Sequence, residues 1–228
     1  MARHPLLGSI DIERIDLILR ETQRLTAVLD RFRGFTRPLS GLSRTLVVLT
    51  EVASNVVSLH EGFAASRGVV LTLRAAAPVV VDCDAQKVKQ ALVNLVQNAL
   101  EASPRGAEVE VSVVAESEEN VALHVRDHGA GIDDAVRRKL FTLGFITKDR
   151  GTGIGLVVAR SAIEQHGGRL ELVSFKAGAA LDGTLDSGQK TATAGVLGAT
   201  MGGTVATIVL PRTRPEVREA LDAAEKPS

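Results

Sequence analysis

Two stretches of alternating apolar residues constrain the fold of this 228-residue chain most. Residues 109–114 and 121–126 carry an aliphatic side chain at every second position, and the polar stretch 116–120 separates them. Because neighbouring side chains of a strand point to opposite faces, this pattern predicts a β-hairpin with one buried face. Further strands are predicted at 68–74, 79–82, 169–174 and 204–210.

Amphipathic segments between these strands predict helices at 43–65, 84–102, 133–140 and 154–165. The resulting fold class is α+β, with antiparallel strands in one layer and helices in the other. We expect this domain to span residues 41–212. It is interrupted by a flexible insertion at 175–203, rich in Gly, Ala, Thr and Ser, and followed by a charged tail at 213–228.

A heptad stripe marks the segment before this domain. Between residues 10 and 35 the apolar side chains recur at spacings of three and four, as Ile15, Ile18, Leu25, Leu29 and Phe32. The other faces are charged, so a single helix would leave its apolar seam in water. We expect residues 1–40 to supply a dimerising helix, and the alternative is that this helix packs on its own domain.

The composition narrows the functional classes. Basic and acidic side chains balance at 27 each, so the chain lacks the excess positive charge that drives binding to nucleic acid. The single Cys83 excludes an intramolecular disulfide, and the five scattered His give no zinc-site spacing. No apolar run reaches the ~20 residues of a membrane span. We therefore expect a cytoplasmic protein with no nucleic-acid partner and no membrane span in this chain.

The first cluster of candidate site residues lies on the helix at 84–102. Asn94, Asn98 and Glu101 follow one another at helical steps of four and three, so their polar ends share a face. Amide oxygens are hard ligands, and Mg²⁺ bridged to phosphates needs few protein ligands. The segment alone is also compatible with ordinary surface or satisfied amides.

The second cluster, Asp127-His-Gly129-Ala-Gly131, directly follows a predicted strand. Glycines at alternate positions let the backbone approach a planar ligand, and the aspartate can accept a hydrogen bond from an exocyclic amine. The alternative is a turn without a binding function, because Asp and Gly after a strand commonly form a turn.

The third cluster, Gly151-Thr152-Gly153-Ile154-Gly155-Leu156, leads into the helix at 154–165. Flexible glycines and a helix N-terminus together offer backbone N–H groups to phosphate oxygens. A dinucleotide-binding fingerprint would require a strand directly before the glycines, whereas the preceding residues 140–150 have the character of a loop.

The order and spacing of the three clusters resemble the N, G1 and G2 boxes of the Bergerat-type ATPases. Within that superfamily the residues of these motifs are most similar to those of sensor histidine kinases of the nitrogen-regulator type. Asn94-Leu-Val-Gln-Asn98-Ala99 resembles the N box, residues 141–145 resemble the F box, and 144–156 resemble the lid and G2 box. The resemblance extends from residue 24 to 211. It implies a two-layer α/β sandwich with a mixed, mainly antiparallel sheet and helices on one face.

The resemblance also implies roles for single residues. Asp127 would take the adenine amine, Gly129 and Gly131 would let the base lie against the backbone, and Asn98 would ligate Mg²⁺. Asn94 would lie beside the phosphates and orient the reacting group. The phosphates of ATP would be wrapped by the third cluster, which consists of Gly151, Thr152, Gly153, Ile154, Gly155 and Leu156, with Lys148 as a charge partner.

The implied function is an ATP-dependent protein-histidine kinase that passes phosphate from ATP to a His and on to a response-regulator receiver domain, within a homodimer. Only residues 3–7 resemble the family's phosphoacceptor stretch, and His4 aligns with the Asn of that stretch. The acceptor histidine is therefore expected upstream of Met1 or on a partner. His4 as a substitute acceptor is a further option. The alternatives are a non-catalytic dimeric adaptor that docks a response regulator, and an ATPase or serine kinase of the same superfamily.

Overall fold

The structure is a computed structural model that describes residues 41–133, 136, 139–142, 153–175 and 202–212. The chain divides into two compact units, Met1–Ser40 and Gly41–Ser228, and every described residue belongs to the second unit. The predicted heptad helix, half of the helix predicted at 133–140, nearly all of the insertion and the tail from 213 lie outside the described residues. They stay predictions.

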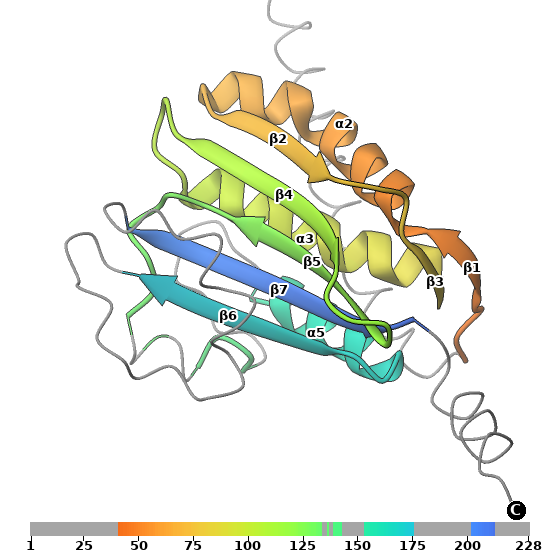
Figure 1. The fold of residues 1–228 in the computed structure, drawn as a ribbon. Helices are drawn as coiled ribbons and strands as arrows, with labels where there is room; N and C mark the ends of the chain where they lie inside the picture. Colours follow the sequence, from red (N-terminus) through yellow and green to blue (C-terminus); the bar gives the residue numbers. More distant parts are fainter. Residues whose placement is uncertain (1–40, 134–135, 137–138, 143–152, 176–201, 213–228) are drawn as a thin grey trace, which may run out of the picture. The chain divides into compact units, whose positions relative to one another are not determined.

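A five-stranded sheet forms one layer of the second unit (Figure 1). Its order is β2-β4-β5-β7-β6, and β2 runs parallel to β4 while the other neighbours are antiparallel. Val111 lies opposite Val125, which confirms the predicted hairpin in the register that buries one face. The strands are β2 (Val70–Ala75), β4 (Glu108–Ala115), β5 (Asn120–Arg126), β6 (Arg169–Phe175) and β7 (Gly203–Pro211).

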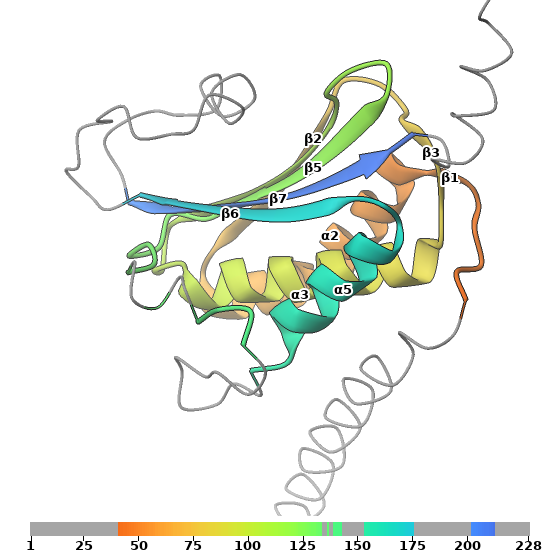
Figure 2. The same ribbon diagram turned by 90° about the horizontal axis from the view of Figure 1, so that it is seen from below.

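Helices α2 (Leu49–Arg67), α3 (Ala85–Ala102) and α5 (Gly155–Gln165) cover one face of this sheet (Figure 2). Asp84 caps α3, because its carboxylate accepts the backbone N–H groups of Gln86 and Lys87. The two-layer α+β fold is thereby confirmed, with helices on a single face. Within the part of the chain that the structure describes, no helix combines the length and the apolar character needed to cross a membrane.

The start of α2 corrects one prediction. The helix expected from residue 43 begins only at Leu49, because β1 (Thr45–Val48) precedes it and pairs antiparallel with β3 (Val80–Cys83). The segment is rich in β-branched residues, which favour a pleated strand over a helix. The backbone N–H of Leu49 donates to the carbonyl of Val79 at 2.7 Å, so the strand pairing continues to the first helical residue.

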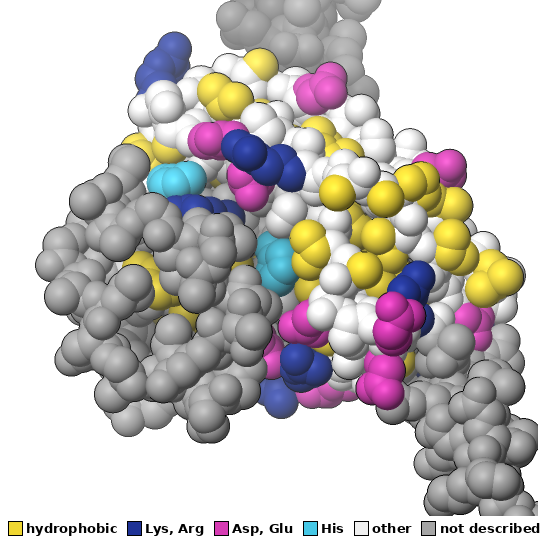
Figure 3. Space-filling model, in the orientation of Figure 1, with side chains coloured by type: hydrophobic (Ala, Val, Ile, Leu, Met, Phe, Trp, Pro, Cys, Tyr) yellow, Lys and Arg dark blue, Asp and Glu magenta, His cyan; other side chains and the backbone are white. Residues whose placement is uncertain are grey.

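The core between the layers is aliphatic. Side chains from alternate positions of β4 and β5, such as Val111 and Leu123, meet fully buried residues of the helices, among them Leu92 and Ile163. On the opposite face of the sheet, hydrophobic side chains lie among charged ones (Figure 3). The hydrophobic core therefore lies between the helices and the sheet. The candidate site lies at the edge of these layers, in the loop after β5 and the segment before α5.

Candidate nucleotide-binding site

Asp127 is held rigidly where β5 ends. Its side chain is buried, and its Oδ1 accepts the backbone N–H of Gly129 at 2.9 Å and that of Thr204 at 3.1 Å. The backbone N–H of Asp127 donates in turn to the carbonyl of Thr204 at 2.9 Å. A charged acceptor with two backbone donors is strongly oriented. The carboxylate is therefore fixed between the turn after β5 and the start of β7.

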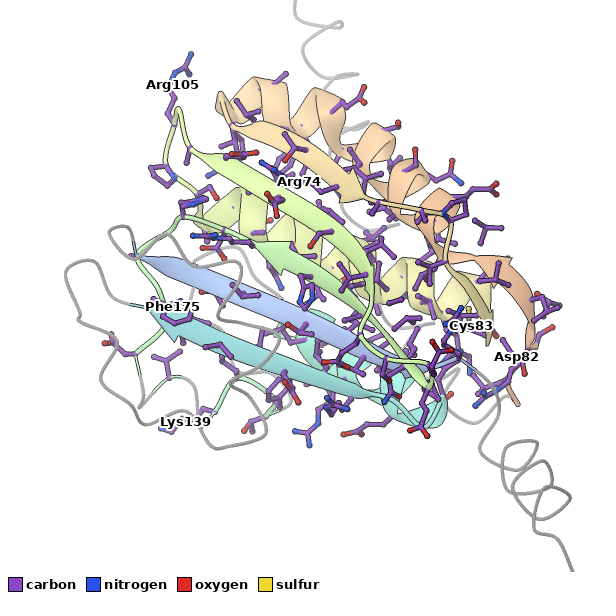
Figure 4. The ribbon with its side chains drawn as sticks, viewed as in Figure 1. Arg74, Asp82, Cys83, Arg105, Lys139 and Phe175 are labelled. Atoms are coloured by element: carbon purple, nitrogen blue, oxygen red, sulfur yellow. The ribbon has the colours of Figure 1, made fainter. Side chains whose placement is uncertain are left out.

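The glycines beside Asp127 are required by close packing. Gly131 has φ +77°, and a Cβ atom there would lie 2.5 Å from the carbonyl oxygen of Phe175, at the end of β6 (Figure 4). A Cβ atom at Gly129 would lie 2.8 Å from the carbonyl oxygen of Ala102, the last residue of α3. The turn is thus pressed between β6 and α3, which is a structural reason for both glycines besides the predicted approach of a ligand.

Two residues that tie this turn together were missed from the sequence. Thr204 pairs with Asp127 through both of its backbone groups. Ser174 accepts the N–H of Ile132 at 2.6 Å and donates to the carbonyl of Gly203 at 3.3 Å, so it joins the turn to β6 and β7. The glycine pair before Thr204 is a signal that could have pointed to it, whereas Ser174 has none, since its partner lies 42 residues away.

Helix α3 brings the first and third clusters together. The Asn94 amide donates through Nδ2 to the carbonyl of Gly155, the first residue of α5, at 3.2 Å. Asn98 lies one turn further along the same face and is half-buried, and its side chain makes no hydrogen bond to any described residue. Glu101 behaves differently, because its carboxylate accepts the Gln97 amide at 3.0 Å.

The start of α5 has the geometry expected of an anion-binding end. Gly153 has φ +63°, and Ile154 occupies the N-cap position without a side-chain cap. The first backbone N–H groups of α5 therefore carry the partial positive charge of the helix end. Leu156 packs against the core, so only its backbone can serve a ligand. Lys148, Gly151 and Thr152 lie outside the described residues.

Together these contacts place the clusters along one helix. The Asp127 turn packs on the last residue of α3, Asn98 lies one turn earlier, and Asn94 a turn earlier still contacts α5. From Asn94 to Ala102 the helix rises about 12 Å, a span that a nucleoside triphosphate can bridge. Among the described residues, no three His, Cys, Asp or Glu side chains gather as a metal site.

Burial governs the titratable groups around this core. Burial raises the pKa of the Cys83 thiol to about 11, helped by Asp84 and Asp82, so the thiol stays protonated and unreactive at neutral pH. Burial lowers the pKa of His166 and, on β5, of His124, whose Nδ1 lies 3.0 Å from Thr207 Oγ1.

These two histidines predict an acid-sensitive fold. Because their pKa values are lower in the folded chain than in the unfolded one, the unfolded state binds more protons below about pH 6.5. Their contribution to stability is complete above that pH and is lost as the pH falls toward the lowered values. Urea unfolding at pH 7.5, 6.0 and 5.0 should show a decreasing free energy of unfolding. The double variant H124Q/H166Q should show a shallower decrease than the wild type, and an equal slope would contradict the assignment.

Comparison with known proteins identifies the domain. The family described as histidine kinase-, DNA gyrase B-, and HSP90-like ATPase matches residues 83–214. The sensor protein DegM of Bacillus sp. (strain B21-2) is 32% identical over 160 residues, which cover 70% of this chain and 41% of DegM. The sensor histidine kinase ZraS of Klebsiella oxytoca is 34% identical over 159 residues, which cover 69% of this chain and 34% of ZraS. The chain thus spans less than half the length of these relatives.

Solved structures share the fold. The catalytic domain of histidine kinase ThkA, in a nucleotide-free form, superposes with a TM-score of 0.61 at 24% identity, covering 75% of this chain and 97% of that domain. Full-length ShkA in complex with AMPPNP superposes with a TM-score of 0.70 at 18% identity, covering 91% of this chain and 40% of ShkA. ThkA in complex with the response regulator TrrA superposes with a TM-score of 0.64 at 21% identity, covering 93% of this chain and 54% of that chain.

The resemblance read from the three motifs is therefore confirmed at the level of sequence profile, relatives and fold. The described elements from α3 to β7 lie within the matched residues 83–214. The chain belongs to the family of histidine kinase-, DNA gyrase B- and HSP90-like ATPases, and its curated relatives include sensor histidine kinases.

Proposed function

We propose that this chain is the ATP-dependent catalytic region of a protein-histidine kinase in a two-component system. It would transfer phosphate from ATP to a histidine, from which the phosphate passes to an aspartate of a response-regulator receiver domain. The observation that carries the proposal is the arrangement along α3, where the Asp127 turn, Asn98 and the start of α5 follow one another. Because ATP is the phosphate source, the region would work in the cytoplasm.

The nucleotide would lie along α3 with its base at the Asp127 turn. The Asp127 carboxylate would accept the exocyclic amine of adenine, while the backbone of Gly129 and Gly131 would face the ring. The phosphates would lie at the start of α5, where Gly153 and the first turn of the helix, which has no side-chain cap, offer backbone N–H groups. Lys148, Gly151, Thr152, Ile154 and Leu156 complete the proposed phosphate-binding segment.

Asn98 is the proposed protein ligand of Mg²⁺. Its half-buried amide has no hydrogen-bond partner among the described residues, so its oxygen is available to a cation. A single amide oxygen suits Mg²⁺, which takes most of its remaining ligands from phosphates and water. When bound, the cation would neutralise developing charge on the transferring phosphoryl group.

Asn94 supports transfer to a protein side chain over hydrolysis. Its amide is tied to Gly155 and so lies beside the proposed phosphate site. An amide cannot remove a proton from water, whereas a glutamate at this place could. Asn94 would therefore orient the reacting groups. The unprotonated nitrogen of the acceptor imidazole would attack the γ-phosphorus without needing a base, while the bond from that phosphorus to the bridging oxygen breaks and ADP leaves.

Phosphate transfer is the experiment that tests the proposal. The full chain is incubated with γ-labelled ATP and Mg²⁺, with and without a separate helical segment that carries the acceptor histidine of a related kinase. Acid-labile, base-stable label on that segment is the expected result, and label on this chain that the variant H4Q loses would identify His4 as an acceptor. Saturable ATP binding without labelled protein would contradict the kinase function, and absence of both would support the adaptor alternative.

Dimerisation through the heptad stripe is a separate prediction. Replacing Leu25 and Leu29 by glutamate would place charges in the apolar seam, so a dimer should dissociate into monomers. Light scattering of the wild type and of L25E/L29E measures this directly, with the exposed change L59E on α2 as the control. A wild-type chain that is already monomeric would overturn the prediction.

A further inference from the structure

A buried histidine joins the two helices of the proposed site at their far ends. His166 directly follows α5 and is 1% exposed. Its Nδ1 lies 2.6 Å from the carbonyl oxygen of Ala162, and its Nε2 lies 2.9 Å from the backbone nitrogen of Asp84. Because the amide of Asp84 can only donate, Nε2 is the acceptor and Nδ1 carries the proton. The ring is therefore neutral and links the end of α5 to the N-cap of α3.

Polar side chains reinforce this junction. The Asp84 carboxylate caps α3 and also accepts the backbone N–H of Ser43 at 3.2 Å. Lys87 in the first turn of α3 donates to Gln165 Oε1 at 2.7 Å, and Arg44 donates to the backbone carbonyl of Gln165 at 3.3 Å. The first turn of α3 and the last turn of α5 are thus fixed to each other by directional contacts.

The same two helices meet again at the proposed phosphate site. Since Asp84 lies near the end of α5 and Asn94 near its start, α3 and α5 run antiparallel and side by side (Figure 2). Within the described domain, Cys83, next to Asp84, lies at the end opposite Phe175, which borders the Asp127 turn (Figure 4). The eleven residues of α5 span about 16 Å between the two junctions.

Between these junctions the helices bury small and aliphatic side chains. Ala91 and Leu95 of α3 and Ala159 and Ile163 of α5 are all buried. Such surfaces attract without fixing a register, because apolar packing has little directionality. The hydrogen bonds at the two ends therefore decide how far α5 lies along α3.

We propose that His166 is a positioning residue for the nucleotide site: its two hydrogen bonds set the register of α5 on α3 and so hold the start of α5 against Asn94. The inference rests on the proposed function, because it assigns the start of α5 to the phosphates. The adenine end of the site rests on β5, β7 and the end of α3, and it does not involve α5.

The charges around the ring explain how pH acts on this junction. Burial and the cations of Arg44 and Lys87 disfavour protonation of His166, while Asp84 and the bond to Ala162 favour it. Protonation would place an N–H opposite the N–H donor of Asp84, so that bond would be lost. Acidification should therefore loosen the register of α5 before the core unfolds.

The test compares ATP with adenosine. In the full chain, H166L should weaken Mg²⁺-ATP affinity about tenfold and leave adenosine affinity unchanged, because only the phosphates depend on α5. H166Q, whose amide oxygen can accept the Asp84 N–H, should restore ATP affinity toward the wild type. His60 supplies the matched control, since it is also buried and its Nδ1 contacts the carbonyl of Val56 four residues earlier, but it lies on α2. H60L should leave the ratio of the two affinities unchanged.

Equal losses for ATP and adenosine, or no loss in a folded H166L, would overturn the inference. Hydrogen exchange gives a readout that needs no nucleotide. The Val158 amide, bonded to the Ile154 carbonyl at 3.0 Å in the first turn of α5, should exchange faster in H166L than in H60L. A wild type that binds neither ligand refutes the proposed function, while the exchange result still decides the role of His166. If H166L fails to fold, the pH dependence of ATP affinity decides: the wild type should lose more affinity between pH 7.5 and 5.5 than H166Q, and equal losses would refute the inference.

Discussion

Replacing Asp127 by asparagine is expected to weaken ATP binding at least tenfold while the fold is kept. The asparagine oxygen can still accept the N–H groups of Gly129 and Thr204, which now meet Asp127 Oδ1. Its amide nitrogen, however, would face the exocyclic amine of adenine, donor against donor. A lost hydrogen bond to a charged group with a buried donor left over costs about 2–3 kcal/mol, or more than tenfold in affinity.

A second nucleotide and a second variant test the assignment of Asp127 to the adenine amine. Inosine triphosphate carries a carbonyl where adenine has its amine, so D127N should bind it better relative to ATP than the wild type does. The alanine variant is less informative, because it strands two buried backbone donors and should lower stability as well. Calorimetric titrations with both nucleotides, together with thermal unfolding, measure these effects. Unchanged ATP affinity in a folded D127N would refute the adenine assignment.

Replacing Asn98 by alanine is expected to remove the dependence of nucleotide binding on Mg²⁺. ATP affinity in the presence of Mg²⁺ should fall to the value measured with a chelator, and phosphate transfer should fall about a hundredfold or more, because the cation supplies several kcal/mol of charge stabilisation. Stability should change little, since Asn98 is only half-buried and its side chain makes no hydrogen bond to a described residue.

The neighbouring amide provides the control for this variant. Gln97 is on the same helix, but its amide donates to Glu101 and it is not a proposed ligand of the cation. Q97A should therefore keep both the Mg²⁺ dependence and the transfer rate. A metal titration of ATP affinity for wild type, N98A and Q97A separates the cases. If N98A and the wild type respond equally to Mg²⁺, Asn98 is not the ligand.

Strong local periodicity made most of the fold predictable. The strands of the hairpin and helices α3 and α5 lie within a residue or two of the predicted bounds, because alternation and capping signals such as Asp84 are local. Strand β1 was missed for the opposite reason. Four residues in an amphipathic context look like the first turn of a helix, and only the distant partner β3 selects the strand.

The sequence names candidate site residues where they lie in short motifs. Asp127 and the glycines around it could be named as candidates because their spacing is local. Thr204, Ser174 and His166 were not assigned to the site, since each acts through a partner far along the chain. His166 in particular looked like an ordinary histidine outside any acceptor context. Its two bonds to different helices become visible only when the fold brings α5 beside α3.

One nucleotide is expected to contact the Asp127 turn and the start of α5 at the same time. Nuclear magnetic resonance of the ¹⁵N-labelled chain during titration with Mg²⁺ and a non-hydrolysable ATP analogue tests this most directly. We predict that the amide signals of Gly129, Gly131 and Gly155 shift with a single common saturation curve, while those of Val70 and Val114 on the opposite face of the sheet do not move. Shifts confined to one of the two regions, or none at all, would contradict the claim.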